Sequence, residues 1–324
     1  MPIFFLQERR LANILTPATA LGKKKPFLVY LIRDRWLYFL LIPGVLYFLV
    51  FKYAPMWGLI IAFQDYSPFK GFLKSNWVGL RNFYDFFINP DFLRLLRNTL
   101  VMSALNLIFF FPMPIILALM LNELRNFLFK RTVQTIIYIP HFISMVIVYS
   151  ITYVILSIMG GPVNGLMIKL FGHPIDFLAS EAWFRPLILI QLIWKETGWG
   201  TIIFLAALAG VDVELYEAAI VDGAGRLRRL IHITLPSIMS TIVVLLILRI
   251  GYVLDNGFEQ IFLMTNALNH SVADVFDTYV YEVGLRLGAF SYSTAIGMFK
   301  AVVGLILIWS TNFLAKKAGQ SGIM

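Results

Sequence analysis

Six apolar stretches, each close to the length of a bilayer crossing, constrain this chain more than any other feature. A helix needs about 20 mostly apolar residues to cross the hydrocarbon layer of a membrane. We place the six spans at Trp36–Tyr53, Asn98–Leu121, Val133–Ile158, Phe184–Ala209, Ser237–Leu254 and Tyr292–Leu314. Backbone polar groups in lipid must be paired within their own segment, so we predict an all-α, polytopic membrane protein.

The composition supports a protein embedded in lipid. Hydrophobic residues make up 59% of the 324 residues and charged residues 14%, whereas a soluble domain is about half apolar and a quarter charged. The formal net charge is +9. In a soluble protein this excess would suggest nucleic acid as a partner. Here basic residues in cytoplasmic loops explain it, and we expect no nucleic acid partner.

Cysteine and histidine usage limits the chemistry of the chain. There is no cysteine, which excludes disulfides, thiolate catalysis and cysteine metal sites. The four histidines lie far apart in sequence, at His141, His173, His232 and His270. None shows a spacing such as H-x-x-x-H, so we predict no metal site.

Basic residues near the span ends set the expected orientation. Cytoplasmic flanks of membrane spans carry an excess of Lys and Arg. Such residues are concentrated in residues 1–35, in the loops around Lys130 and Arg228, and at residues 316–317. We therefore predict a cytoplasmic arm over residues 1–35, a transmembrane domain over 36–315, a cytoplasmic tail over 316–324, and both termini inside the cell. The expected outside segments are Ala54–Arg97, Gly160–Trp183 and Asp255–Ser291.

The inside segment 210–236, between the fourth and fifth spans, has the most distinctive pattern. It is expected to form a short helix, a glycine break, a second, basic helix, and a proline that opens the fifth span. Glu214 and Glu217 share one face of the first helix through their three-residue spacing. Gly223 permits a sharp turn, and Pro236 suits the first turn of a helix.

This segment resembles the EAA loop of ABC importer permeases, which reads E-A-A, three residues, G, nine residues, then I-x-L-P. The matching residues, at the spacing of that pattern, are Glu217, Ala218, Ala219, Asp222, Gly223, Ala224, Ile233, Leu235 and Pro236. The resemblance implies the type I permease fold, with six transmembrane helices in the bacterial cytoplasmic (inner) membrane. It also implies a coupling helix that docks on a cytoplasmic ATPase subunit, with Glu217 at the ATPase surface and Gly223 ending the helix.

The same resemblance implies the partners. They are a second homologous permease subunit, two cytoplasmic ATPase subunits, and a periplasmic or lipid-anchored solute-binding protein. The chain contains no G-x-x-x-x-G-K-[ST] phosphate loop, whose glycine-rich backbone would hold nucleotide phosphates. We therefore expect ATP and Mg on the ATPase subunits, and neither a cofactor nor a catalytic site on this chain.

Three further segments resemble the polysaccharide branch of sugar-importer permeases, which includes subunits of alginate importers. They are Gly257–Phe262, Asp277–Tyr281 and Phe290–Ala295. The resemblance implies an oligo- or polysaccharide substrate, acidic if the likeness to alginate importers holds.

Ionisable residues inside the spans suggest where such a substrate would bind. Each costs about 2.5–3.5 kcal/mol on membrane-insertion scales, so each is a functional hypothesis. The residues predicted to line the substrate pathway are Lys195, Glu196, Trp199, Arg249, Tyr252, Asn256 and Lys300. Their spacing places the first three on one face of the fourth span, and the next three on one face of the fifth. Three cations against one carboxylate favour an acidic sugar.

Each of these residues also has a structural interpretation. Lys195 or Arg249 can pair with Glu196 and join two helices, and Lys300 can pair with a partner subunit or extend to the membrane surface. Two other classes of function also remain open. An ion-coupled secondary transporter would use Glu196 and His141 as a relay. A membrane enzyme would need a catalytic constellation such as H-E-x-x-H, which the sequence lacks.

Overall fold

The computed structural model describes residues 35–319 and 322–323. Most of this part is helical, as the spans predicted. Residue contacts divide the chain into two compact units, residues 1–58 and residues 59–324, which we describe separately. Almost all of the predicted cytoplasmic arm, residues 1–34, lies outside the described residues, as do 320–321 and 324 of the predicted tail.

The candidate membrane spans match the six predicted ones in order. Four are continuous helical stretches: Arg35–Phe63, Phe92–Asn122, Glu181–Ala209 and Phe290–Lys317. Two more are pairs of helices joined at a bend: Phe127–Phe142 with Met145–Leu156, and Arg226–Ser237 with Met239–Gly251. With each bent pair taken as one crossing, the described residues contain six spans. Most helices run several residues past the predicted ends.

The spans are built from α-helices interrupted by 3₁₀ and π turns, the latter two written η. In order they are α3 (Arg35–Phe48), η1 (Leu49–Tyr53), η2 (Ala54–Phe63), α6 (Phe92–Leu105), η3 (Asn106–Phe110), α7 (Pro112–Asn122), α8 (Phe127–Tyr138), η4 (Ile139–Phe142), α9 (Met145–Leu156), α11 (Glu181–Ala209), α13 (Arg226–Arg229), η5 (Leu230–Thr234), α14 (Leu235–Ser237), α15 (Met239–Gly251) and α19 (Phe290–Lys317).

Shorter elements fill the connections. They are β1 (Gln64–Asp65), α4 (Gly71–Lys74), β2 (Asn76–Trp77), α5 (Arg81–Phe87), α10 (Pro162–Phe171), α12 (Val213–Val221), α16 (Phe258–Met264), α17 (His270–Ala273), α18 (Phe276–Tyr281) and η6 (Glu282–Arg286). The two strands pair antiparallel, with Gln64 opposite Trp77 and Asp65 opposite Asn76.

The third predicted span, Val133–Ile158, is not one continuous helix. Its two halves meet at 99°, because Pro140 lies in a 3₁₀ turn and Ile143 and Ser144 are extended. Proline lacks the N–H that a helix interior needs. The Ser144 side chain then caps α9 by accepting a hydrogen bond from the Ile147 N–H. This span therefore turns sharply where the sequence suggested a straight crossing.

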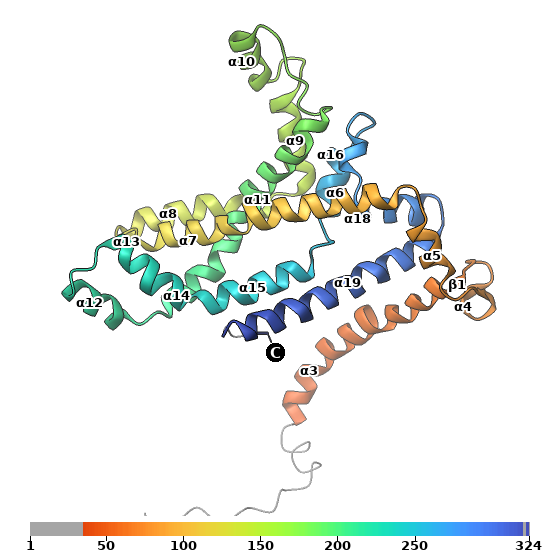
Figure 1. Cartoon of the computed structure of the whole chain (residues 1–324), viewed down its shortest axis with the longest axis horizontal. Helices are drawn as coiled ribbons and strands as arrows, with labels where there is room; N and C mark the ends of the chain where they lie inside the picture. Colours follow the sequence, from red (N-terminus) through yellow and green to blue (C-terminus); the bar gives the residue numbers. More distant parts are fainter. Residues whose placement is uncertain (1–34, 320–321, 324) are drawn as a thin grey trace, which may run out of the picture. The chain divides into compact units, whose positions relative to one another are not determined.

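Helix α11 is the centre of the 59–324 unit (Figure 1). It packs along α7 and also contacts α8, η4, α16 and α17, while α15 packs along α19. One apolar cluster lies around the first half of α11 and includes Phe184 and Ile188. Another lies around its last turns and includes Phe204 and Leu208.

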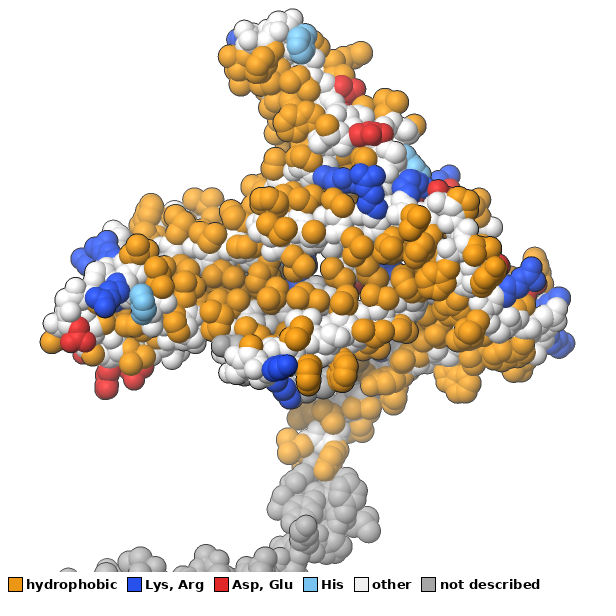
Figure 2. Space-filling view, viewed as in Figure 1, with side chains coloured by type: hydrophobic (Ala, Val, Ile, Leu, Met, Phe, Trp, Pro, Cys, Tyr) orange, Lys and Arg blue, Asp and Glu red, His pale blue; other side chains and the backbone are white. Residues whose placement is uncertain are grey.

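The outer surface of the helices is apolar, as lipid contact requires. Figure 2 shows hydrophobic side chains over the sides of the helical body, and charged groups gathered near its ends. Exposed examples are Leu305 on α19 and Ile136 on α8. Large exposed apolar surfaces on a soluble protein would promote aggregation. In a bilayer, the same surfaces face the lipid chains.

The closest helix contact depends on a glycine. A Cβ added at Gly198 of α11 would lie 1.9 Å from the backbone oxygen of Ile137, at the end of α8. No side chain fits at that distance, so α11 and the bent third span can meet only with glycine here.

We expect Gly198→Ala to destabilise the folded chain by about 1–3 kcal/mol, the usual cost of overpacking. The measurement is the temperature at which detergent-purified protein loses its monodisperse gel-filtration peak. Gly297→Ala is the matched control, because a Cβ at that helical glycine meets nothing within 4 Å. Equal behaviour of the two variants would contradict the close contact.

Candidate functional site

A cavity of about 510 Å³ opens beside the middle of α11. Its walls come from α11, α15, α16, the end of η3 and the first residue of α9. The lining residues are Phe110, Met145, Leu192, Lys195, Glu196, Trp199, Gly200, Arg249, Gly257, Phe258, Glu259 and Gln260. We call this the central cavity. It brings together four residues of the predicted pathway: Lys195, Glu196, Trp199 and Arg249.

One side of the central cavity is an ion-paired cluster that holds the bend of the third span. The Lys195 ammonium lies 3.2 Å from a Glu196 carboxylate oxygen and donates to the His141 backbone oxygen at 2.6 Å. The other Glu196 oxygen lies 2.8 Å from Nδ1 of His141. The His141 ring stacks face to face on Trp199, with centroids 4.4 Å apart and planes 4° apart. Lys195 and Glu196 therefore pair with each other, as the structural interpretation of these residues predicted.

Arg249 lies on the opposite side of the central cavity. Its guanidinium stands over the Phe110 ring, 5.3 Å from the ring centroid. Among the described residues, no carboxylate lies within ion-pair distance of it, and its side chain makes no hydrogen bond. A guanidinium has five N–H donors in a fixed planar fork. Arg249 thus presents donors that the surrounding side chains do not use.

The other predicted pathway residues lie outside the central cavity. Helix α15 ends at Gly251, so Arg249, Tyr252 and Asn256 do not share the face of one helix as predicted. The three residues nevertheless line one small cavity together. Tyr252 is exposed and, with Lys300, lines a groove between α15 and α19. Asn256 is buried, with its amide donating to the Thr99 backbone oxygen at 3.2 Å. Their part in a substrate pathway stays a prediction.

Lys300 forms ion pairs within this chain. Its ammonium lies 2.6 Å from Asp255 and also contacts Asp277. The predicted excess of three cations over one carboxylate therefore does not occur at one place. Lys300 is neutralised elsewhere, and the central cavity gains Glu259 from α16.

The segment 210–236 forms the predicted short helix, glycine turn and basic helix. Pro236 does not open the fifth span as predicted, because helical structure already begins at Arg226 and Pro236 lies just before the bend. The Asp212 carboxylate accepts from the Glu214 N–H at 2.9 Å and so begins α12. After α12 the chain reverses at Gly223, whose φ is +75°, a conformation that favours glycine. The Ala224 N–H closes this turn on the Ala219 oxygen at 2.8 Å. The basic helix α13 follows.

This segment presents an apolar surface that nothing in the described chain covers. No residue of α12 is buried, and Val221 is 87% exposed. Glu217 is also exposed. The helix is nevertheless fixed to the transmembrane part, because the Tyr216 hydroxyl lies 3.0 Å from the Thr234 hydroxyl. Of the other motif residues, Ala218 and Ala219 lie on α12, and Asp222 and Ala224 lie in the turn. Ile233, Leu235 and Pro236 lie just before the bend of the fifth span.

Comparison with known proteins identifies the family. Residues 110–320 match the family described as "Binding-protein-dependent transport system inner membrane component". The chain belongs to this family. It is therefore a multi-pass inner-membrane permease that works with a solute-binding protein, and its family consists of transport components without catalytic sites of their own. The predicted fold class is confirmed, and an enzyme or an ion-coupled secondary transporter is not what this family indicates.

Relatives of the permease are sugar transport proteins. It is 62% identical over 307 residues to "Protein LplB" of Bacillus subtilis, with 95% of this chain and 96% of the relative covered. It is 59% identical to the "Polygalacturonan/rhamnogalacturonan transport system permease protein YteP" of the same organism, with 93% and 94% covered. A chain in the crystal structure of a bacterial alginate ABC transporter, solved with an alginate-bound periplasmic protein, matches with a TM-score of 0.83. The two sequences are 40% identical, and the match covers 92% of this chain and 99% of the transporter chain. The permease is a subunit of a sugar ABC importer.

The permease site contains residues that the sequence did not assign. Phe110, Phe258 and Glu259 line the central cavity beside the predicted residues, and His141 braces Glu196 and Trp199. Gly257, with φ of +78°, lets the chain turn back into α16. The sequence linked the segment Gly257–Phe262 only to the polysaccharide branch of sugar-importer permeases. Its apolar pattern is too short to predict the helix α16.

We expect Tyr216→Phe to loosen α12 without unfolding the permease. Loss of one hydrogen bond costs about 0.5–1.5 kcal/mol, so amides of residues 213–221 should exchange with deuterium about two- to tenfold faster. Mass spectrometry of the purified permease measures this rate. Tyr252→Phe, at an exposed tyrosine, is the control and should leave exchange in α12 unchanged. Identical rates in all three proteins would show that the hydroxyl does not hold the helix.

Proposed function

We propose that this permease and a second, homologous permease together form the membrane pathway for an acidic oligo- or polysaccharide. Two cytoplasmic ATPase subunits, which hold the ATP and Mg, drive the transport. A periplasmic or lipid-anchored binding protein delivers the substrate. One observation supports an acidic substrate above all: the guanidinium of Arg249 lies in the central cavity and has no ion-paired carboxylate among the described residues.

The central cavity suits a saccharide in shape and chemistry. Its volume of about 510 Å³ lies within the range of about 300–1,000 Å³ typical of small-molecule sites. Trp199 is 45% exposed, and its ring is held flat by His141 on one side. A rigid aromatic ring offers a sugar a stacking surface at little cost in side-chain entropy. Glu259 and Gln260 supply groups for hydroxyl hydrogen bonds.

The hydrogen-bond donors of Arg249 suit an acidic sugar. Lys195 and Glu196 pair with each other, and although Glu259 also lines the cavity, it makes no ion pair with Arg249 in the described residues, so the guanidinium donors of Arg249 remain for a substrate. Arginine binds a carboxylate through two parallel hydrogen bonds. The similarity to a polygalacturonan/rhamnogalacturonan permease and to an alginate transporter supports the same substrate class.

Helix α12 is the proposed contact with an ATPase subunit. It follows directly after α11, whose Trp199 and Glu196 line the central cavity. A movement of α12 therefore acts on the cavity through one continuous helix. ATP binding would close the ATPase subunits and turn the cavity outward, and hydrolysis would reset it. Segment 210–236 and both termini would then lie in the cytoplasm.

We expect Arg249→Ala to impair import of an acidic oligosaccharide much more than import of a neutral one. Loss of a charged hydrogen-bonding partner typically costs about 1.5–3 kcal/mol, so uptake efficiency should fall by about ten- to hundredfold. Uptake of labelled trigalacturonate and galactotriose by proteoliposomes containing the whole importer measures both. Arg249→Lys keeps the charge but loses the fork, and should give an intermediate loss. Equal losses for the two sugars would make Arg249 structural.

We expect Glu217→Lys to leave the permease folded in the membrane but to detach or uncouple the ATPase subunits. The substitution reverses a charge on the exposed surface of α12. Copurification of the ATPase subunits and sugar-stimulated ATP hydrolysis are the measurements. Glu123→Lys, at an exposed glutamate after α7, is the control. Normal association and transport in the Glu217 variant would overturn the coupling assignment.

A further inference from the structure

A second cavity, of about 460 Å³, lies at the opposite end of α11 from the coupling helix. We call it the outer pocket. It is lined by Asp91, Arg94, Phe262, Thr265, His270, Asp274, Thr278, Tyr279, Glu282 and Arg286. Ser271, next to His270, bonds to Glu181 in the first turn of α11. The 29 residues of α11 span about 43 Å at 1.5 Å per residue, which is the distance between the outer pocket and the coupling helix. The outer pocket shares no lining residue with the central cavity, although α16 contributes to both.

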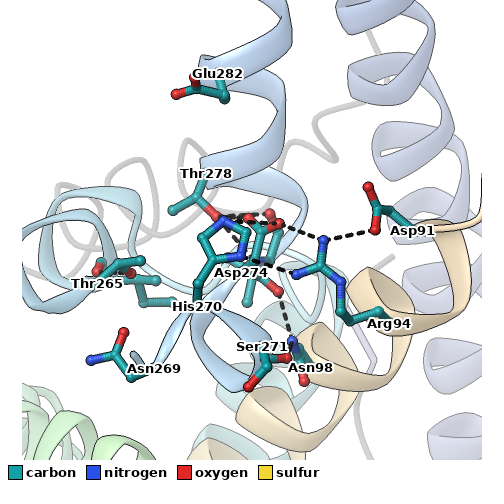
Figure 3. Close-up of polar contacts among 12 residues, drawn as sticks. Asp91, Arg94, Asn98, Thr265, Asn269, His270, Ser271, Asp274, Thr278 and Glu282 are labelled. Carbon is teal, nitrogen blue, oxygen red and sulfur yellow. Dashed lines mark hydrogen bonds and ion pairs between the residues drawn. The ribbon is translucent and has the colours of Figure 1, made fainter. Parts of the chain in front are cut away.

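The polar side chains of the outer pocket are held in place by one another (Figure 3). Arg94 reaches Asp91 at 2.9 Å, Asp274 at 3.3 Å and Nδ1 of His270 at 3.3 Å. Because arginine only donates, Nδ1 of His270 is the acceptor in this contact. Asp274 also accepts from the Thr278 hydroxyl at 2.8 Å. The groups are thus positioned in advance, which lowers the entropy cost of binding.

These side chains retain hydrogen-bonding capacity. A guanidinium has five N–H donors and a carboxylate about four lone-pair positions. Arg286 is bound only to Glu282, at 2.8 Å, among the residues that the structure describes. Phe262 is 43% exposed and rests against Phe258 and Tyr281, so it is a supported aromatic surface. Hydrogen-bond donors, acceptors and an aromatic surface around one cavity are suited to binding a sugar ring.

The charges of the outer pocket favour an uncharged ligand. Three carboxyl groups, on Asp91, Asp274 and Glu282, outnumber the two guanidiniums of Arg94 and Arg286. Both guanidiniums already have carboxylate partners, unlike Arg249 in the central cavity. Burial raises the pKa of the Asp274 carboxyl, against the opposing effects of Thr278, His270 and Arg94. No group of His, Asp or Glu in the described residues is placed to hold a metal ion.

We propose that the outer pocket is a second saccharide-binding site, which takes an uncharged sugar unit through its hydroxyl groups and stacks it on Phe262. The inference rests on the proposed function for its saccharide and for its place on the outer side of the membrane. For a saccharide with both kinds of unit, the central cavity would then bind an acidic unit and the outer pocket an uncharged one.

Saturation-transfer NMR tests this site on the complete importer in nanodiscs, without binding protein or ATP. The probes are α-1,4-galactobiose and α-1,4-digalacturonate, which differ only in the carboxylates. We expect galactobiose to bind, and Phe262→Ala to weaken it by about tenfold, the effect of losing one anchoring contact. Arg286→Gln, at an exposed side chain that cannot disturb the core, should also weaken galactobiose. Neither variant should change digalacturonate binding.

Two control variants locate the signal. Phe87→Ala removes an exposed aromatic ring outside both cavities and should have no effect. Trp199→Ala alters the central cavity and should leave galactobiose bound, which separates failure of this inference from failure of the proposed function. The inference is overturned if galactobiose does not bind, or if Phe262→Ala and Arg286→Gln bind it normally. Loss of binding-protein affinity alone in these variants would show a protein-docking surface instead, and would equally overturn it.

Discussion

The contact between α11 and the bend of the third span is the interaction on which the rest of the structure depends. A bent helix leaves backbone groups without helical partners, and in lipid each such group costs several kcal/mol unless the protein satisfies it. Here the Lys195 ammonium bonds the freed His141 carbonyl, and Gly198 lets the two backbones approach. Within one turn, α11 therefore provides the Lys195 donor that pairs the freed carbonyl and the glycine, Gly198, that leaves room for the bend. Both are needed for the bend and for the central cavity beside it.

The same contact explains why ionisable residues inside the spans divide into two kinds. Lys195, Glu196 and Lys300 all have opposite charges beside them, so their insertion cost is offset within the chain. Arg249 has the face of Phe110 against it and, although Glu196 and Glu259 line the same cavity, no carboxylate within ion-pair distance in the described residues, which is a weaker compensation. A cation left in this state inside a membrane protein is more easily explained by a ligand than by folding. Arg249, rather than the total number of charges, therefore indicates the substrate.

The sequence predicted well those features that depend on local pattern. Span positions follow from long apolar runs, and the turn at Gly223 follows from a residue that alone tolerates its φ. Features that depend on distant partners were not predictable. Nothing local shows that Lys300 meets Asp255 and Asp277. Likewise α15 ends at Gly251 although its apolar pattern continues, because the chain must turn there before α16 returns to the cavity.

The continuity of α11 gives these local features a common mechanical consequence. The helix runs unbroken from Glu181, beside the outer pocket, past the central cavity to Ala209, just before the coupling helix. Pro186 lies inside it without a break, whereas the third and fifth spans bend by 99° and 59°. The second half of α11 packs on α7, and His141 braces the middle of α11. In the mechanism that we propose, a displacement of α12 would therefore reach the central cavity through α11, and the bent spans would accommodate the change.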